Sequence, residues 1–295
     1  MKRLKNTVQY RAIFILFILI PIASSLQGQE SDNPFFFTSL NIENGLSQQT
    51  VNAIYQDTDG YLWFATRNGL NRYDGYEFKV YRKNYRDTHS LCGNEIQSIT
   101  QDSAKDLWIG TIEGINRIDY KTGEIFRYLL PGDNNIEAMF HSSRDELFFF
   151  TSTQAWHYDR INDTIRPFRF GHLPEKAYVR AVTEDLQHHL YLGTAQGVFI
   201  YDRNREFLEH LPCNAQAEIS LPGDYVSFMT VDDTGQVWIV SSYNRVSCWN
   251  PMTRRLDTVE GLHNVGVIRD FKIRYNRLAE ALCFYVLAVI FTDRY

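Results

Sequence analysis

The sequence predicts an all-β fold, a β-propeller built of four-stranded antiparallel blades. The first observation is an internal repeat: residues 57–74 return as residues 102–119 without a gap, and looser copies follow at 147–151, 190–194 and 237–241. The second is the spacing of the aromatic anchors of these copies. They recur roughly every 40 to 47 residues, an interval typical of propeller blades, and are Trp63, Trp108, Phe148, Tyr191 and Trp238.

The first repeat contains the strands and turns of one blade. Alternating apolar and polar residues predict a strand at 51–56, and further strands are predicted at 61–66, 70–73 and 76–81. Gly60 suits the first turn because glycine accepts a positive φ, and Asp74-Gly75 is a hairpin signal. We therefore predict a propeller over residues 51–266, with blades near 51–81, 96–128, 136–168, 179–211 and 226–259.

The N-terminus predicts export. Basic residues between positions 2 and 11 precede an apolar run at 12–20, which small and polar residues follow. This is the pattern of a secretory signal peptide, and the apolar run is short for a membrane span. We predict a signal peptide at 1–28 and a periplasmic protein, with retention as a membrane anchor as the alternative. Residues 29–50 are predicted to form an N-terminal strand segment that completes the last blade.

Composition restricts the partners and cofactors. Of 295 residues, 44% are hydrophobic and 15% aromatic, which is ample for a buried core. The net charge of −5 does not favour nucleic acid as a partner. The cysteines lie far apart, without the spacing of a metal site or redox pair. We expect isolated thiols, or at most one incidental disulfide, and no cofactor; these residues are Cys92, Cys213, Cys248 and Cys283.

The recurring uncharged residues are interpreted as structural. Large flat rings can fill the wedge between adjacent sheets, and the tryptophans among them are Trp63, Trp108 and Trp238. Two positions later, small residues are expected where strands crowd near the axis; these are Ala65, Gly110 and Gly193. Phe150 and Val240 break this second pattern.

Two charged features of the repeat also have structural interpretations. Arg72 and Arg117 are expected to pair with carboxylates of their blades. The segment 57–60 resembles the start of a calcium loop, but Asn68 stands where such a loop requires a bidentate glutamate. We therefore predict a turn there and no metal site.

Several of these segments also resemble a known sensor class. Residues 44–47, 60–63 and 69–75 read NGLS, GYLW and GLNRYDG. They are similar to the two-component regulator propeller repeats in the periplasmic region of hybrid two-component sensor kinases of gut Bacteroidetes. The resemblance covers about residues 35–250 and is strongest before Tyr120.

The resemblance implies a function. Members of this class usually carry two propellers, a small β-sandwich, a membrane helix, a kinase core, a receiver and a DNA-binding domain, and they sense oligosaccharides. The chain would then be an N-terminal fragment of the ligand-sensing region. Its expected partners are an oligosaccharide and the missing C-terminal sensor domains or a second protomer. Because the kinase domain is absent from this chain, we expect no enzymatic activity.

Residues 267–295 do not continue the repeat. Another aromatic anchor should arrive near residue 283 after an Asp-x-x-Gly turn, but the chain has an apolar run at 281–291 instead. Our preferred hypothesis is a shifted reading frame or broken gene, which truncates the protein before its membrane helix and kinase. The alternative is a degenerate sixth blade. Either way we expect about five to six blades in an incomplete ring, which leaves sheet edges exposed.

The sequence does not identify a binding residue. Propellers commonly bind ligands at the face that carries the connections between blades, here predicted at 82–95, 129–135, 166–178 and 206–225, and the turns between second and third strands, such as 67–68. Aromatic and planar polar side chains there would suit a sugar, and they are Tyr85, His89, Asn94, His172, Asn214 and Tyr225. For each of them the favoured interpretation is a solvated loop residue, so we assign no ligand-binding residue.

Two other functions are possible. One is a self-contained secreted propeller that acts as a protein-binding scaffold. The other is a propeller lyase or glycosidase, because streptogramin lyase has repeats with a similar Gly-x-x-Trp pattern. Catalysis would need convergent acids, bases or a metal. The histidines are scattered without recurring metal-ligand spacing, and we assign no catalytic residue; they are His141, His157, His172, His188, His189 and His210.

Overall fold

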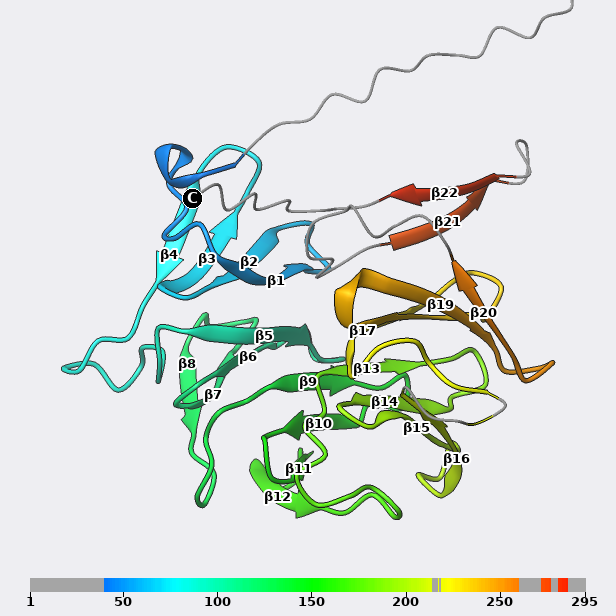
Figure 1. Ribbon diagram of the computed structural model, residues 1–295. Coiled ribbons are helices and arrows are strands. Elements are labelled where there is room, and N and C mark those ends of the chain that lie inside the picture. The colour runs from blue at the N-terminus through cyan, green and yellow to red at the C-terminus, as the bar shows by residue number, and fades with distance from the viewer. Residues whose placement is uncertain (1–39, 214–216, 218, 260–271, 277–280, 286–295) are drawn as a thin grey trace, which may run out of the picture. The chain divides into compact units, whose positions relative to one another are not determined.

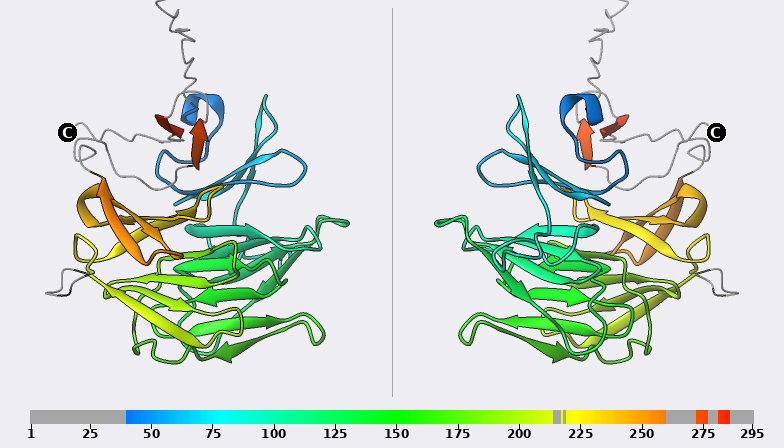
Figure 2. Two further views of the ribbon diagram at one scale, coloured as in Figure 1. Left: turned by 90° about the vertical axis from the view of Figure 1, so that its right-hand side faces the viewer. Right: turned by 90° about the vertical axis from the view of Figure 1, so that its left-hand side faces the viewer.

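The computed structural model describes residues 40–213, 217, 219–259, 272–276 and 281–285. In this part of the chain, five antiparallel sheets of four strands each pair their strands in chain order. Each sheet is one blade, and the blades follow one another in a ring (Figures 1 and 2). The predicted fold class, an all-β propeller of four-stranded blades, is confirmed.

The five blades are built alike, from short strands of four to six residues. Blade 1 consists of β1 (Val51–Gln56), β2 (Leu62–Thr66), β3 (Gly69–Tyr73) and β4 (Phe78–Tyr81). Blade 2 consists of β5 (Ile96–Gln101), β6 (Leu107–Thr111), β7 (Gly114–Ile118) and β8 (Ile125–Tyr128). Blade 3 consists of β9 (Ala138–His141), β10 (Leu147–Phe150), β11 (Ala155–Asp159) and β12 (Thr164–Phe168). Blade 4 consists of β13 (Ala181–Glu184), β14 (Leu190–Thr194), β15 (Gly197–Tyr201) and β16 (Phe207–Pro212). Blade 5 consists of β17 (Val226–Val231), β18 (Val237–Ser241), β19 (Arg245–Asn250) and β20 (Arg255–Val259).

The remaining elements are short. The 3-10 helix η1 (Ile42–Asn44) precedes β1, and η2 (Ser242–Asn244) joins β18 to β19. Strands β21 (Lys272–Asn276) and β22 (Ala281–Tyr285) pair as a two-stranded antiparallel sheet. Within the described ranges, no helix has the length and apolarity to cross a membrane. The predicted signal peptide at 1–28 and most of 267–295 lie outside these ranges, so the leader, the truncation and the sixth blade stay predictions.

A pair formed by an aspartate and a buried aromatic residue fixes the first turn of most blades. In blade 1, Asp57 Oδ1 accepts the backbone N–H groups of Asp59 and Tyr61, at 3.0 and 2.9 Å. Its second oxygen, Oδ2, accepts the indole N–H of Trp63 at 2.7 Å. One carboxylate therefore closes the turn and satisfies the polar atom of the buried ring, as short acidic side chains often do in turns. The predicted turn at 57–60 is confirmed.

Successive blades share buried apolar cores. Trp63 of blade 1 packs with Ile109 of blade 2, and Trp108 of blade 2 packs with Phe149 of blade 3. Similar cores join blades 3 and 4 and blades 4 and 5. For Trp63 and Trp108, the predicted role as a filler between sheets is confirmed. Trp238 belongs instead to a cluster whose described members all come from blade 5.

Small residues on the second strands of blades 2 and 4 allow the next blade to approach closely. A Cβ atom on Gly110 would lie 2.8 Å from Cγ2 of Ile136, which precedes the inner strand of blade 3. A Cβ atom on Gly193 would lie 2.7 Å from Cγ1 of Val226 in blade 5. Both distances are too short for a real Cβ contact, so glycine is required by packing at these two sites.

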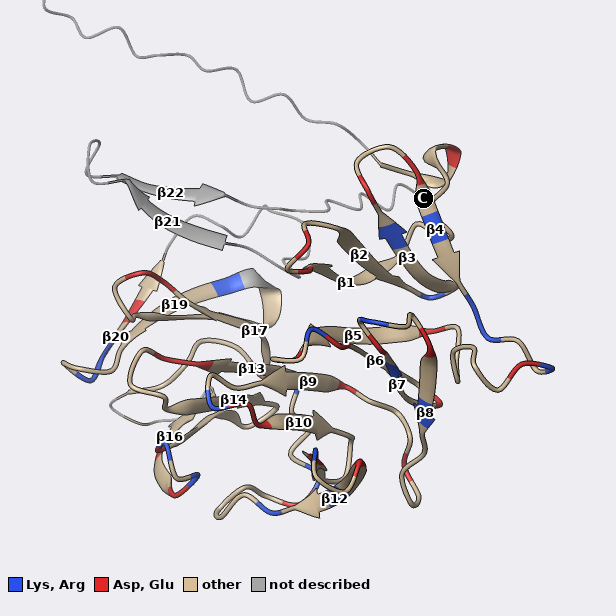
Figure 3. Ribbon diagram, turned by 180° about the vertical axis from the view of Figure 1, so that it is seen from behind, with Lys and Arg blue, Asp and Glu red and all other residues tan. Residues whose placement is uncertain are grey.

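Charged side chains lie mainly in turns and connections (Figure 3). The second strands β2, β6, β10, β14 and β18 contain no charged residue, and they are almost entirely buried. Charged groups able to contact a ligand are consequently placed at the ends of the strands, where the chain enters and leaves each blade.

Candidate functional site

A cavity of about 570 Å³ lies between the inner strands of the five blades. Each of β1, β5, β9, β13 and β17 contributes to its wall. This volume is in the range of small-molecule sites. The lining residues are 51–54, 67, 95, 97–99, 137–139, 180–182, 225 and 227–229.

Three β-bulges bring polar side chains to the cavity wall. The register shifts by one residue between 51 and 53 in β1, between 96 and 98 in β5, and between 226 and 228 in β17. A bulge re-aims the extra residue. The extra residues are Asn52, Gln97 and Ser227, and all three line the cavity. Each also holds a hydrogen bond: Asn52 Nδ2 donates to the carbonyl of Ile96 at 2.8 Å, for example.

Five larger polar residues gather at one end of the cavity, which we call the mouth. Glu95, Glu137, Arg180 and Tyr225 each immediately precede an inner strand, in blades 2, 3, 4 and 5 respectively. Arg67, in the turn between β2 and β3, is the contribution of blade 1. The turn and the strand starts lie at the same end of a blade because antiparallel strands alternate in direction. The mouth is therefore assembled from every blade.

On the blade 1 and blade 2 side of the mouth, the charges are paired. Arg67 Nε lies 3.9 Å from Glu95 Oε1, and Gln97 Nε2 donates to the same oxygen at 3.2 Å. The Arg67 side chain is 60% exposed, so this ion pair contributes little to stability. Because the two charges are opposite and close together, they largely cancel for a ligand on this side of the mouth.

On the blade 3 to blade 5 side, charged groups have neutral partners. Asn135 Nδ2 donates to Glu137 Oε1 at 2.8 Å. The guanidinium of Arg180 lies 5.6 Å from the centre of the Tyr225 ring, a cation–π distance. Neither Glu137 nor Arg180 forms an ion pair with a described residue.

This arrangement is suited to binding. The mouth offers two guanidinium groups, two carboxylates and one aromatic ring above a wall of mixed polar and apolar side chains, so it can both hydrogen-bond and pack against a ligand. Among the residues that the structure describes, no group of three His, Cys, Asp or Glu side chains could hold a metal ion.

Of the candidates proposed from the sequence, Tyr225 lines the cavity. Tyr85 and His89 do not: Tyr85 is 90% exposed with the Lys83 ammonium over its ring, and His89 lies near the carboxylate of Glu124. Both belong to the connection between blades 1 and 2.

Two further candidates have structural contacts. Asn94 Oδ1 accepts the backbone N–H of Lys83 at 2.8 Å, and its carbonyl accepts the N–H of Gly69. The His172 ring stacks on Phe207 with centroids 4.5 Å apart. Asn214 lies outside the described residues.

Sequence reasoning missed Glu137 and Arg180, which follow the predicted connections at 129–135 and 166–178. A signal was available, because each is the residue directly before the first apolar residue of an inner strand. Aligning the five repeats at that point would have placed Glu95, Glu137, Arg180 and Tyr225 at equivalent positions.

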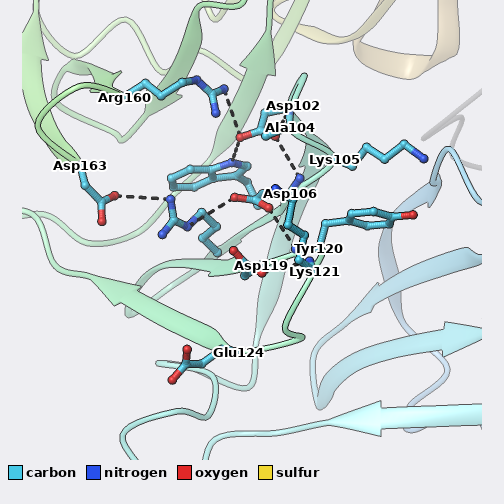
Figure 4. A network of polar contacts seen from close by, with 12 residues as sticks. Asp102, Ala104, Lys105, Asp106, Asp119, Tyr120, Lys121, Glu124, Arg160 and Asp163 are labelled. Carbon is cyan, nitrogen blue, oxygen red and sulfur yellow. Dashed lines mark hydrogen bonds and ion pairs between the residues drawn. The ribbon is translucent and has the colours of Figure 1, made fainter.

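A second cluster of charged groups joins blades 2 and 3 (Figure 4). Arg117 Nη1 lies 3.5 Å from Asp163 Oδ1, and Arg117 Nε lies 3.7 Å from Asp106 Oδ2. The hydroxyls of Tyr128 and Tyr158 both donate to Asp163, at 2.6 and 2.8 Å. These contacts link blade 2 to blade 3, although Arg117 Nε itself is buried without a hydrogen-bond partner, so we interpret the cluster as structural.

Burial and hydrogen bonding shift the acidic groups of this cluster in opposite directions. Burial raises the pKa of Asp106, although a backbone N–H bond and Arg117 oppose it. Burial also acts on Asp163, but the two tyrosine hydroxyls and Arg117 outweigh it and lower the pKa of that carboxyl. Burial and the bond to Asp163 raise the pKa of Tyr158 to about 12.

The predicted carboxylate pairing of the repeat arginines is confirmed for Arg117 and wrong for Arg72. The guanidinium of Arg72 lies 4.5 Å from the centre of the Tyr61 ring, and it forms no ion pair with a described residue. The reason is visible in the repeat, because Tyr61 occupies the position that Asp106 occupies in blade 2.

Comparison with known proteins agrees with this architecture. The profile of the family described as two component regulator propeller matches residues 45–68 and 90–113. Histidine kinase P4 of Formosa agariphila is 43% identical over 79 residues, which are 27% of this chain and 6% of that protein. The chain thus spans a small part of this curated relative.

Solved structures share the fold. The extracellular domain of a putative hybrid two-component system from B. thetaiotaomicron matches with a TM-score of 0.66 and 24% identity, over 83% of this chain and 33% of that one. Virginiamycin B lyase from Staphylococcus aureus matches with a TM-score of 0.54 and 15% identity, over 70% and 68%. Residues 45–68 and 90–113 therefore match the two-component regulator propeller repeat, and the fold is similar to that of the extracellular domain of a putative hybrid two-component system, in agreement with the resemblance seen in the sequence.

Proposed function

We propose that this chain is a ligand-sensing periplasmic region of a hybrid two-component signal-transduction protein, and that its ligand is an oligosaccharide bound at the mouth of the central cavity. The observation that carries this proposal is the convergence of polar residues from all five blades on one central cavity. Binding there would contact every blade at once. It could therefore alter how the propeller packs against further sensor domains or a second protomer.

The chemistry of the mouth supports a sugar. Pyranose rings present hydroxyls in the ring plane and C–H groups on their faces, so they need planar hydrogen-bonding groups beside an aromatic ring. Glu95, Glu137 and Gln97 supply acceptors and donors, and Tyr225 supplies the ring. Tyr225 is 39% exposed, so a ligand can reach it.

The proposal involves no chemical change of the ligand. The fold is shared with streptogramin-type lyases as well as with sensor regions, so fold alone does not separate binding from catalysis. The distinction rests on the mouth, where the acidic groups already hold amide or arginine partners.

The test is calorimetric titration of the purified chain with a panel of oligosaccharides, followed by chromatography of the recovered sugar. We expect saturable binding without turnover. Tyr225→Ala should weaken binding about tenfold, as loss of an aromatic anchor commonly does. Tyr85→Ala is the matched control, since it removes an equally large ring from an exposed position away from the cavity.

Three results would count against the proposal. Cleaved or rearranged sugar would indicate an enzyme. Equal weakening by Tyr85→Ala and Tyr225→Ala would move the site to the blade connections. Absence of binding across the panel, together with specific capture of a periplasmic protein, would favour the scaffold function.

A further inference from the structure

We propose that the mouth selects an acidic oligosaccharide, whose carboxylate, as in a uronic acid, is bound by Arg180. This inference rests on the proposed function and specifies the chemical class of its ligand.

The first step is the distribution of charge around the mouth. The positive group of blade 1, Arg67, already faces Glu95. Arg180 is the other guanidinium at the mouth; it lies over the Tyr225 ring and forms no ion pair with a described residue. A ligand anion can therefore reach Arg180 without first breaking an ion pair.

The second step is the separation of Arg180 from Glu137. These residues belong to adjacent blades and precede neighbouring inner strands, yet no ion pair joins them. Asn135 holds the Glu137 carboxylate by a hydrogen bond of 2.8 Å, and the Tyr225 ring holds the Arg180 guanidinium. Opposite charges are thus fixed apart beside the cavity, and a ligand that places an anion near one and a hydroxyl near the other would contact both.

The third step is the match of chemical groups. A guanidinium presents two parallel N–H donors that fit a planar carboxylate, and such charge-assisted bonds are stronger than neutral ones. Glu137 retains acceptor capacity for sugar hydroxyls. Because two carboxylates also line the mouth, a ligand with several negative charges would be repelled, which favours one carboxylate at this position.

The experiment titrates the purified chain with matched pairs of probes. Each pair is a uronic acid oligosaccharide and its methyl ester, which has the same linkage and size but no charge; a sulfated oligosaccharide is included. We expect the acid to bind about tenfold more tightly than its ester, and the difference to shrink as salt is raised.

Two variants that each remove one positive charge test whether Arg180 is the residue that recognises the carboxylate. Arg180→Gln should abolish the preference for the acid while leaving binding of the ester nearly unchanged. Arg169→Gln, at an exposed position in the same connection but outside the cavity, should retain the preference. Arg180→Lys should restore part of it, because the charge returns without the forked donors.

The outcomes separate the two proposals. Equal affinity for acid and ester, or a preference that survives in Arg180→Gln, overturns this inference and leaves an oligosaccharide sensor standing. Tighter binding of the sulfated probe than of the uronic acid overturns it as well. If neither member of any pair binds while another oligosaccharide of the panel does, this inference fails and the proposed function stands; if no oligosaccharide of either set binds, both fail.

Discussion

Blades 2 and 3 fix the same turn and the same buried aromatic position with different side chains. In blade 2, the Asp102 carboxylate accepts the backbone N–H groups of Ala104 and Asp106, and its Oδ2 accepts the indole N–H of Trp108 at 2.9 Å. In blade 3, Ser142 Oγ accepts the N–H of Glu146 at 3.1 Å, and the aromatic position holds Phe148, which has no polar atom.

The comparison shows that the indole donor of the aromatic position and its carboxylate acceptor are replaced together. Trp108 and Phe148 are both fully buried. A buried indole N–H without an acceptor costs about 1–3 kcal/mol, whereas phenylalanine needs no acceptor. The serine of blade 3 can therefore cap its turn without having to accept a hydrogen bond from the ring, and its hydroxyl donates to Glu146 Oε2 at 3.2 Å. Blade 4 shows an intermediate pair, in which the Tyr191 hydroxyl donates to Asp185 Oδ2 at 2.9 Å.

The neighbouring blade adapts as well. Arg160 of blade 3 reaches back to Asp102 at 3.2 Å. Arg205 of blade 4 reaches blade 3, but since Ser142 carries no charge, it forms an ion pair with Glu146 instead and lies over the Phe148 ring. An arginine therefore bridges each of these two pairs of blades, but its carboxylate partner is at a different position of the turn: Asp102 in blade 2 and Glu146 in blade 3.

The largest expected effect is the loss of the blade 2 anchor. Asp102→Ala leaves the Trp108 indole N–H unpaired, removes two backbone caps and deprives Arg160 of its buried partner, so we expect a loss of about 3 kcal/mol in the free energy of unfolding. The equivalent Ser142→Ala should cost about 1 kcal/mol. Urea unfolding followed by tryptophan fluorescence measures both. Equal losses would show that the aspartate acts only as a turn cap.

The second largest loss of stability is expected from overpacking at Gly110, two residues after Trp108 on β6. Gly110→Ala places a methyl group 2.8 Å from Ile136 Cγ2, and overpacking of this kind costs about 1–3 kcal/mol. In blade 3 the corresponding position holds Phe150, whose ring stacks on Phe170 of the following connection. Gly171→Ala is the control, because its Cβ would meet nothing within 4 Å. A similar midpoint of urea unfolding for both variants would contradict the close approach.

A double-mutant cycle should convert blade 2 to the blade 3 arrangement. Asp102→Ser and Trp108→Phe each break the pair alone, but together they recreate the combination of Ser142 and Phe148. We expect the double variant to be more stable than the sum of the single effects predicts, by about 1 kcal/mol. The coupling comes from the same urea curves, and strict additivity would refute the idea that the two residues are replaced as a pair.

These pairs also show what the sequence could and could not predict. The repeat of residues 57–74 at 102–119 predicted the blades, because strand alternation and turn residues are local signals. It predicted that Trp108 packs between sheets, but not that its indole N–H bonds to Asp102, six residues earlier, although the same spacing recurs at Asp57 and Asp232.

The cavity could not be predicted from local sequence patterns. The bulges that turn Asn52, Gln97 and Ser227 inward depend on the register against the next strand, and nothing in a single strand marks a shift of one residue. An alignment of the repeats would place Glu137 and Arg180 at equivalent positions, but it would not show that both line one cavity, because that depends on the placement of five blades around one axis.

The smallest expected effect concerns the acid stability of the interface between blades 2 and 3. Asp163 has a lowered pKa in the folded protein, so its stabilising contribution is present above the unfolded carboxyl pKa of about 3.9 and is lost as pH falls through the lower folded value. Asp106 has a raised pKa, so its charged form is disfavoured in the folded state, and acid relieves that cost. We therefore expect the free energy of unfolding, measured with urea between pH 5 and pH 3, to fall less steeply with acid in Asp163→Asn than in the unmodified chain. In Asp106→Asn it should fall more steeply. Because Asp163 is half exposed, the change should be modest, and slopes that move in the same direction in both variants would contradict opposed roles for the two carboxylates.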